Sequence, residues 1–146
     1  MKIRVMGIGD YGQVYALWKN TPNMGLNNID DSKDGIHKYL LRNPNTCFVA
    51  EQGGKIVGVI LSGHDGRRGY MHHAAVAQDF QRQGIGAKLV NAAMAALENE
   101  GVTKVALVVY EKNESGNKFW ESLGFTMRTD LVCRNKEISK SIRYEG

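Results

Sequence analysis

A glycine-containing loop in the middle of the chain has the composition of a phosphate-binding site. Gln81-Arg82-Gln83-Gly84-Ile85-Gly86 lies between an apolar stretch and a long alanine-rich stretch that begins at Ala87. In the order strand, loop, helix, the first N–H groups of the helix are unpaired and lie at the positive end of the helix dipole. Glycine lets the backbone approach a diphosphate closely, and Arg82 adds a positive charge. The loop therefore predicts a phosphate-bearing cofactor.

Two widespread phosphate-binding motifs do not fit this loop. A Rossmann dinucleotide loop needs a third glycine where this chain has Leu89. A P-loop needs lysine and then serine or threonine directly after its last glycine, whereas Gly86 is followed by Ala87 and Lys88. The cofactor must therefore belong to another class.

The elements around the loop predict a mixed α/β fold with a mainly antiparallel sheet. Strands are expected over residues 2–6, 46–51, 55–62, 70–77, 102–110 and 125–132, the last continuing towards 138. Helices are expected after caps at Asp10 and Ser32, over 84–100 and over 115–123. The near-continuous apolar stretch 102–110 is typical of a strand buried on both faces. The polar end from residue 139 is expected to be mobile or to pair with a sheet edge. A three-strand antiparallel meander before one strand–helix–strand crossover excludes a doubly wound series.

Composition narrows the function classes. The chain has 146 residues, 42% hydrophobic and 23% charged, as in globular proteins, and this argues against a disordered or membrane protein. A net charge of +4 without a dense basic block makes nucleic acid an unexpected partner. We see no apolar leader and expect a cytoplasmic protein that binds no membrane. Cys47 and Cys133 are expected to be buried thiols, with a disulfide as the alternative, and no metal site is expected.

Three motifs together resemble the GNAT superfamily of acetyl-CoA-dependent N-acetyltransferases. They are Ala74-Ala75-Val76, Gln81-x-x-Gly84-x-Gly86-x-x-Leu89 and Asn113-x-x-Gly116-x-x-Phe119-Trp120-x-x-Leu123-Gly124-Phe125. The resemblance covers about residues 46–128 by motif and the whole chain by element order. It implies a single acetyltransferase domain over 1–146, with 1–45 shaping the acceptor side and 46–138 forming the core sheet and the cofactor half. It also implies transfer of an acetyl group from acetyl-CoA to a primary amine by direct attack.

The resemblance places coenzyme A between two parallel strands. The strands 70–77 and 102–110 are expected to splay at their C-terminal ends, where backbone groups pair with the pantetheine arm. The loop amides match the pyrophosphate site, and Asn113 matches a side chain that reaches the cofactor from the far strand. The implied cofactor residues are Ala74, Ala75, Val76, Gln81, Arg82, Gln83, Gly84, Ile85, Gly86, Ala87, Asn113 and Trp120.

Candidate catalytic groups lie on the strand before the cofactor triplet. Alternation places Tyr70, His72 and Ala74 on one face and His73 on the opposite, helix-packed face. In the family the base often lies two or four residues before the triplet, which corresponds to His72 and Tyr70. An imidazole has a suitable pKa for this work, although a structural histidine is the alternative. The Val76 N–H is the candidate for polarising the thioester carbonyl.

Two departures from the family pattern leave other functions open. Trp120 occupies the usual position of a tyrosine that protonates the leaving thiolate, and Val108 stands where some members have a glutamate base. Indole cannot act as an acid of comparable pKa. Trp120 would instead pack on the cofactor arm, wall the acceptor pocket or belong to the core. The alternatives are a non-catalytic acyl-CoA-binding or regulatory module, or transfer of a longer acyl group.

The acceptor is expected to lie between two loops. The turn 64–69 offers Arg67 or Arg68 for a carboxylate and Asp65 for an amine, or is simply a solvated hairpin. The loop 18–28 carries residues unusual for an exposed loop. The candidate acceptor residues are Trp18, Asn23, Met24, His64, Asp65, Arg67 and Tyr110. The partner is expected to be a small-molecule or peptide amine, and a homodimer is an open alternative.

Overall fold

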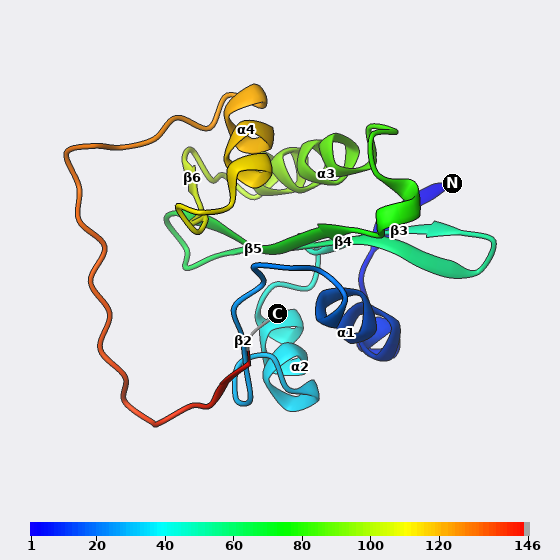
Figure 1. Ribbon diagram of the computed structural model, residues 1–146, viewed down its shortest axis with the longest axis horizontal. Helices are drawn as coiled ribbons and strands as arrows, with labels where there is room; N and C mark the ends of the chain where they lie inside the picture. The colour runs from blue at the N-terminus through cyan, green and yellow to red at the C-terminus, as the bar shows by residue number, and fades with distance from the viewer. Residues whose placement is uncertain (145–146) are drawn as a thin grey trace.

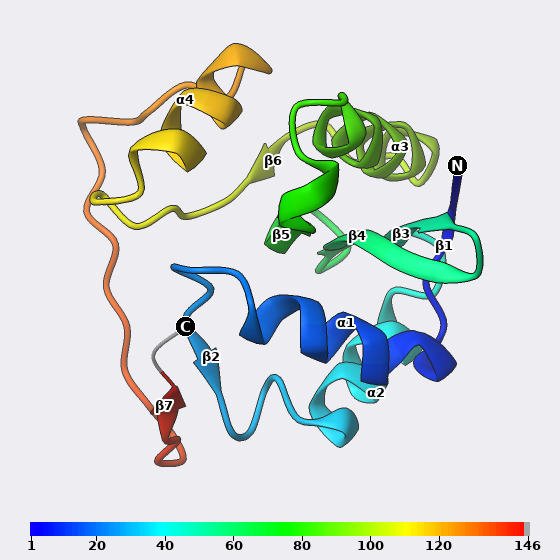
Figure 2. The same ribbon diagram turned by 45° about the vertical axis from the view of Figure 1, so that its right-hand side comes forward.

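A five-stranded sheet in the order β1-β3-β4-β5-β6 lies between two layers of helices in the computed structural model, which describes residues 1–144 (Figure 1). The sheet strands are β1 (Lys2–Val5), β3 (Phe48–Gln52), β4 (Lys55–His64), β5 (Gly69–Val76) and β6 (Val105–Ala106). The helices are α1 (Tyr11–Lys19), α2 (Lys33–Arg42), α3 (Ile85–Asn99) and α4 (Glu114–Ser122), with short 3₁₀ turns η1 (Ile8–Asp10) and η2 (Gln78–Phe80). Figure 2 shows α1 and α2 on one face of the sheet and α3 and α4 on the other. The mixed, mainly antiparallel α/β fold is confirmed.

Each face of the sheet buries its own apolar cluster. Against α1 and α2 the cluster includes Trp18, Leu26, Ile36, Val49, Val59 and Ala75. Against α3 it includes Ala50, Val57, Ile60, Met71, Ile85 and Leu89. Strands β3 and β4 supply side chains alternately to both clusters, as expected for strands covered on both faces.

Local signals explain most element boundaries. The Ser32 side chain accepts a hydrogen bond from the Gly35 N–H at 3.0 Å, which confirms it as the cap of α2. Asp10 stands at the cap position of α1 but makes no capping bond there. Its carboxylate instead pairs with Arg4 at 2.8 Å and accepts from the Gly7 N–H. These bonds hold the turn between β1 and α1.

The strand expected over 102–110 is much shorter in the structure. Only Val105 and Ala106 are in a strand, and they pair in parallel with Gly69 and Tyr70. Val108 is 68% exposed, so the expectation of burial on both faces is wrong. The apolar residues that follow β6 have no strand on their outer side within residues 1–144, and this leaves them open to solvent.

The strand expected over 125–132 is absent from the described part of the chain. Residues 126–140 are all exposed, with Met127 at 84% and Ile138 at 103%. Both views show this segment arching away from the sheet and returning beside β2 (Leu26–Asn27) (Figures 1 and 2). There β7 (Arg143–Tyr144) pairs antiparallel with β2, so the edge-pairing expected of the C-terminal end is found at 143–144. Residues 145–146 lie outside the described residues.

We expect trypsin to cut the native protein first within the segment 126–142. Arg128, Arg134 and Lys136 are exposed there and lie in extended chain that a protease can bind. Brief digestion followed by mass spectrometry should therefore show fragments ending at these residues while α3 stays intact. First cuts within α2, which also contains exposed basic residues, would contradict this description of the C-terminal segment.

The two cysteines have different environments. Cys47 is buried and Cys133 is exposed, and both thiols are free. The expectation that both are buried is therefore wrong for Cys133. Burial raises the pKa of the Cys47 thiol to about 12. Among residues 1–144 no helix is long and apolar enough to cross a bilayer, and no cluster of three potential metal ligands occurs.

Candidate functional site

A β-bulge in β5 determines which way the central histidines point. Val59 pairs with Ala75 and Leu61 with His72, so β5 has one extra residue between these pairs. His73 adopts φ +50° there, a left-handed conformation that is unusual outside glycine. As a result His72 and His73 both face the α1 and α2 side. The simple alternation predicted from the sequence, with His73 opposite His72, is wrong.

The bulge is anchored by α1 and by the segment before α2. The Trp18 Nε1–H donates to the His73 carbonyl at 2.9 Å, and His73 Nε2 lies 2.8 Å from Asp31 Oδ1. Asp31 is buried, and its second oxygen accepts from the Asn27 N–H at 2.8 Å. Trp18, a predicted acceptor residue, lies in α1 with its side chain fully buried, and it does not line the cavity described below. Sequence reasoning missed Asp31, since nothing in its spacing marks it as the partner of a residue 42 positions away.

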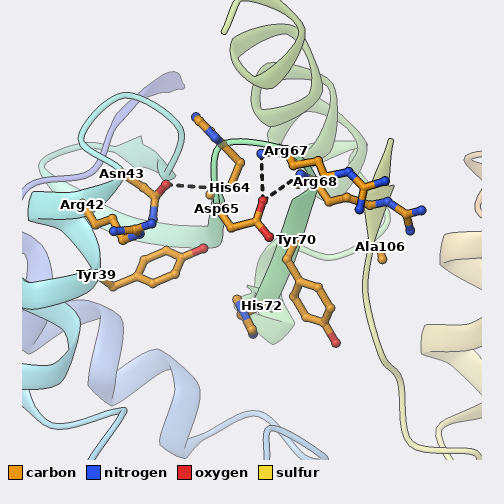
Figure 3. A pocket seen from close by; sticks show the side chains of 12 residues that line it. Tyr39, Arg42, Asn43, His64, Asp65, Arg67, Arg68, Tyr70, His72 and Ala106 are labelled. Carbon is orange, nitrogen blue, oxygen red and sulfur yellow. Dashed lines mark hydrogen bonds between the residues drawn. The ribbon is translucent and has the colours of Figure 1, made fainter. Parts of the chain in front are cut away.

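An open cavity of about 680 Å³ lies beside the bulge, and Figure 3 shows the side chains around it. His72 lies between two phenol rings: its ring centroid is 4.6 Å from that of Tyr70 and 5.8 Å from that of Tyr39. The cavity is lined by Tyr39, Arg42, Asn43, Gly63, His64, Asp65, Arg67, Arg68, Gly69, Tyr70, His72 and Ala106. The structure therefore brings the two predicted catalytic residues to one wall of a single cavity.

The surroundings of His72 favour its neutral form. The packed protein around the ring lowers the pKa of His72, to about 4, because the charged form is poorly solvated, and repulsion from His73 adds to this. Asp31 and Asp30 act in the opposite direction. The other side of the residue is open to the cavity. Burial likewise raises the pKa of Tyr70, so its phenol stays protonated. His72 is thus an unprotonated imidazole facing the cavity near neutral pH.

The turn between β4 and β5 uses two predicted acceptor residues to hold itself together. Asp65 Oδ1 accepts from the backbone N–H groups of Arg67 and Arg68, each at 2.8 Å, and these bonds lower the pKa of its carboxyl. His64 Nε2 lies 2.8 Å from Glu100 Oε1 at the end of α3. The polar groups of Asp65 and His64 are therefore engaged within the protein, whereas Arg67 and Arg68 extend along the cavity towards Ala106 (Figure 3).

A wedge opens between β5 and the segment after β6. Within the described chain no ladder pair joins the two strands beyond Tyr70 and Ala106. Because the Ala77 N–H donates to Val57 on β4 at 2.8 Å, the preceding Val76 N–H points towards the open edge. This confirms that the parallel pair diverges towards the C-terminal end of β5. The unpaired edge offers backbone groups to a ligand that lies along it.

The Tyr110 side chain reaches from the segment after β6 to the loop before β2. A Cβ on Gly25 would lie 2.8 Å from the Tyr110 hydroxyl, so the two are in direct contact. Gly25 has φ +67° and the nearby Asn23 has φ +63°, which shapes a tight loop here. Met24 packs against the cluster on the α1 side. Asn23 and Met24, two of the predicted acceptor residues, therefore lie near Tyr110, which is a third. None of these three residues lines the cavity.

The glycine-containing loop leads directly into α3. Gly84 precedes the helix with φ +79°, and the first helical bond at this end runs from the Lys88 N–H to the Gly84 carbonyl. The preceding amides, including that of Ala87, have no acceptor within the helix. Gln81 Nε2 donates to the Val76 carbonyl at 3.1 Å and ties the loop to the end of β5. A Cβ on Gly86 would lie 3.0 Å from the Phe119 ring, so glycine lets α4 approach the start of α3.

Two residues of the third sequence motif, Asn113 and Trp120, stabilise α4 and its packing. Asn113 Oδ1 accepts from the Gly116 N–H at 3.0 Å and caps the helix. Trp120 packs edge to face against Phe119 at 5.1 Å and Phe125 at 5.2 Å. Asn113 and Trp120 therefore both have roles within the fold that need no cofactor. Their contacts with coenzyme A stay predictions.

Comparisons with known proteins give a consistent result. Residues 13–125 match the model described as the acetyltransferase (GNAT) family. The chain is 33% identical to Acetyltransferase plu1384 of Photorhabdus laumondii over 132 residues, which cover 88% of each chain. It is 28% identical to Acetyltransferase SG1711 of Sodalis glossinidius over 99% of this chain and all of the relative. Among solved structures, Ard1 from Thermoplasma volcanium superposes with a TM-score of 0.78 at 21% identity, covering 87% of this chain and 83% of the other. The PaiA N-acetyltransferase from Thermoplasma acidophilum, solved with coenzyme A, has a TM-score of 0.75 at 16% identity, covering 97% and 96%.

Proposed function

Since this chain belongs to the GNAT family of acetyltransferases and is an acetyl-CoA-dependent N-acetyltransferase, we propose that its acceptor amine binds in the cavity beside His72. One observation carries the proposal: the wedge and the cavity both lie against β5. The open edge of β5 begins where the ladder with β6 ends, at Tyr70, and the cavity is lined by Tyr70 and His72. A thioester lying along the edge and an amine in the cavity would meet at this strand.

The donor is assigned to the wedge and the loop before α3. The pantetheine arm would pair with the backbone of Ala74 to Val76, and the pyrophosphate would lie on the amides from Gln81 to Ala87. Two features support this assignment: the Val76 N–H points to the open edge, and the α3 amides lack intrahelical acceptors. Arg82 is exposed beside the loop and would add charge attraction.

The reaction needs only a positioned amine, a proton acceptor and a polarised carbonyl. The amine nitrogen forms a bond to the thioester carbon while His72 takes the amine proton. The Val76 N–H would stabilise the negative oxygen of the tetrahedral intermediate. The carbonyl then re-forms as the C–S bond breaks, and coenzyme A leaves as a thiolate that takes its proton from water, so that no acid is needed at position 120. Neither cysteine is placed to carry the acetyl group as an acyl-enzyme, because Cys47 is buried with a raised pKa and Cys133 lies in the exposed C-terminal segment.

Reversing the charge at Arg82 tests the donor assignment. We expect Arg82→Glu to raise the dissociation constant of coenzyme A by about tenfold or more, since it replaces a charge-assisted contact to phosphate by repulsion. Isothermal titration of coenzyme A measures this, and release of free thiol with primary amines measures transfer. Arg134→Glu makes the same charge change in the exposed C-terminal segment and should leave affinity unchanged. Equal affinity of the Arg82 variant and the wild type would remove the loop from the donor site.

A further inference from the structure

We propose that the acceptor amine also carries an anionic group, a carboxylate or a phosphate, which Arg67 and Arg68 hold at the end of the cavity away from the bulge. The inference rests on the proposed function, because it takes the cavity as the acceptor site. It adds the chemical class of the acceptor, which neither the fold nor the family determines.

The lining of the cavity carries an excess of positive charge. Among residues 1–144, none of the five close contacts between a basic and an acidic side chain includes Arg42, Arg67 or Arg68. The lining holds one carboxylate, that of Asp65, whose Oδ1 accepts two backbone N–H groups, so one negative charge stands against three positive ones. Three guanidinium groups around one cavity repel each other, and a bound anion offsets that repulsion.

The three arginines come from two sides of the cavity. Arg42 is the last residue of α2, on the same side of the cavity as Tyr39 and Asn43. Arg67 and Arg68 come from the β4–β5 turn on the opposite side (Figure 3). Figure 3 shows the Arg67 and Arg68 side chains extending together towards Ala106 and away from Arg42. Guanidinium groups bind carboxylates and phosphates through parallel N–H donors, so these two neighbouring side chains can bind one anion.

The floor between them is built to stay open and polar. A Cβ on Gly63 would lie 2.6 Å from the Tyr39 hydroxyl and closer still to the Asn43 amide, so glycine lets both polar side chains lie over β4. The Asn43 oxygen is fixed by the His64 N–H at 3.0 Å. The cavity therefore combines a fixed polar floor with three cationic side chains.

The arginines are too distant to serve the phosphates of the donor. Arg67 and Arg68 precede β5, whereas the phosphate loop follows its other end. Strand residues rise by roughly 3.3 Å each, so the eight residues of β5 separate the two sites by roughly 23 Å. An anion at the arginines must therefore belong to the acceptor.

The same geometry bounds the acceptor's length. His72 lies four residues along the strand from Arg68, a span of roughly 13 Å that long arginine side chains shorten. A flexible amine with its anionic group several bonds away fits this spacing. 4-Aminobutyrate and 6-aminohexanoate are probes of this kind, and 3-aminopropyl phosphate replaces the carboxylate by phosphate.

The test compares acceptors that differ only in charge. With acetyl-CoA saturating, free-thiol release is measured for 4-aminobutyrate, 4-aminobutanol and 1,4-diaminobutane, and for the longer acid and the phosphate. We expect kcat/KM for the best anionic amine to exceed that of its neutral counterpart by about tenfold or more, the effect of one charged hydrogen bond or more. Binding of the same compounds to the coenzyme A complex is titrated in parallel, which reports on the cavity without turnover.

Variants assign the preference to the arginines. Arg67→Gln together with Arg68→Gln should raise KM for the anionic amine with little change for the neutral one. Arg134→Gln is the matched control. Equal use of neutral and anionic amines, or a preference that survives the variants, would overturn the inference while the proposed function stands. Absence of thiol release with every amine, with selective binding of the anionic ones, would overturn the proposed function instead. Absence of selective binding as well would overturn both.

Discussion

Replacing His72 with alanine should lower kcat/KM for acetyl transfer by about 10²- to 10⁴-fold, the usual contribution of a general base. The imidazole is in its neutral form, faces the cavity and lies on the strand whose next residues border the donor wedge. The affinity for coenzyme A should change little, because the loop before α3 lies beyond the other end of β5. Initial rates of thiol release measure the first effect, and calorimetric titration measures the second.

The pH dependence gives an independent readout of the same residue. A base accepts a proton only in its neutral form, so activity is lost as the pH falls through the folded-state pKa of His72. Since its surroundings hold that pKa below the ordinary histidine value, the acidic limb of the kcat/KM profile should lie below pH 6.5. Rates are expressed per concentration of unprotonated amine, since an aliphatic acceptor itself titrates at a pKa of about 10 and would otherwise slope the whole profile. In the alanine variant the limb should disappear.

A second histidine variant shows whether the loss of rate is specific to His72. His37 is exposed on α2, and His37→Ala should leave rate and pH profile unchanged. If His72→Ala instead keeps full activity, the base is another group. His73 would then be the next candidate, because it lies on the same face and is paired with Asp31.

Replacing Trp18 with alanine should destabilise the fold by about 3–5 kcal/mol, the usual cost of removing a buried aromatic side chain. The indole is fully buried between α1 and β5, and its removal also leaves the His73 carbonyl without its donor. Chemical denaturation of the two proteins under identical conditions measures the difference in the free energy of unfolding.

The phenylalanine variant divides this cost into two parts. Trp18→Phe keeps most of the apolar contact and removes the N–H, so it should cost about 1–3 kcal/mol, the price of an unpaired buried acceptor. Trp120→Phe is the control on the other face, where the described contacts of the indole are aromatic packing. A loss for Trp18→Phe as large as that for Trp18→Ala would mean that the hydrogen bond to the bulge, and not the packing, dominates.

The sequence predicts the parts of this molecule that depend on local patterns. Ser32 as a cap, the paired strands before the cavity and the glycine-bearing start of α3 follow from periodicity and from residue types with restricted backbone preferences. Tyr70 and His72 could be placed on one wall because alternation holds on that part of β5.

The failures occur where tertiary contacts override local pattern. Alternation breaks at His73 because an extra residue enters β5, and the partners that stabilise this bulge, Trp18 and Asp31, are far away in the sequence. The apolar residues after β6 and after α4 have strand-like composition. A strand also needs a neighbour, and none is present there within residues 1–144. Composition alone cannot report whether that neighbour exists.

The contact between Trp18 and the bulge also gives the protein an optical reporter. Indole emission depends on the polarity around the ring, and a nearby imidazole quenches it more strongly when protonated. The Trp18 ring is buried and meets the His73 ring edge to face at 5.2 Å. With Trp120 replaced by phenylalanine, Trp18 becomes the single tryptophan. Its emission then follows changes at the strand beside the reacting centre without any added label.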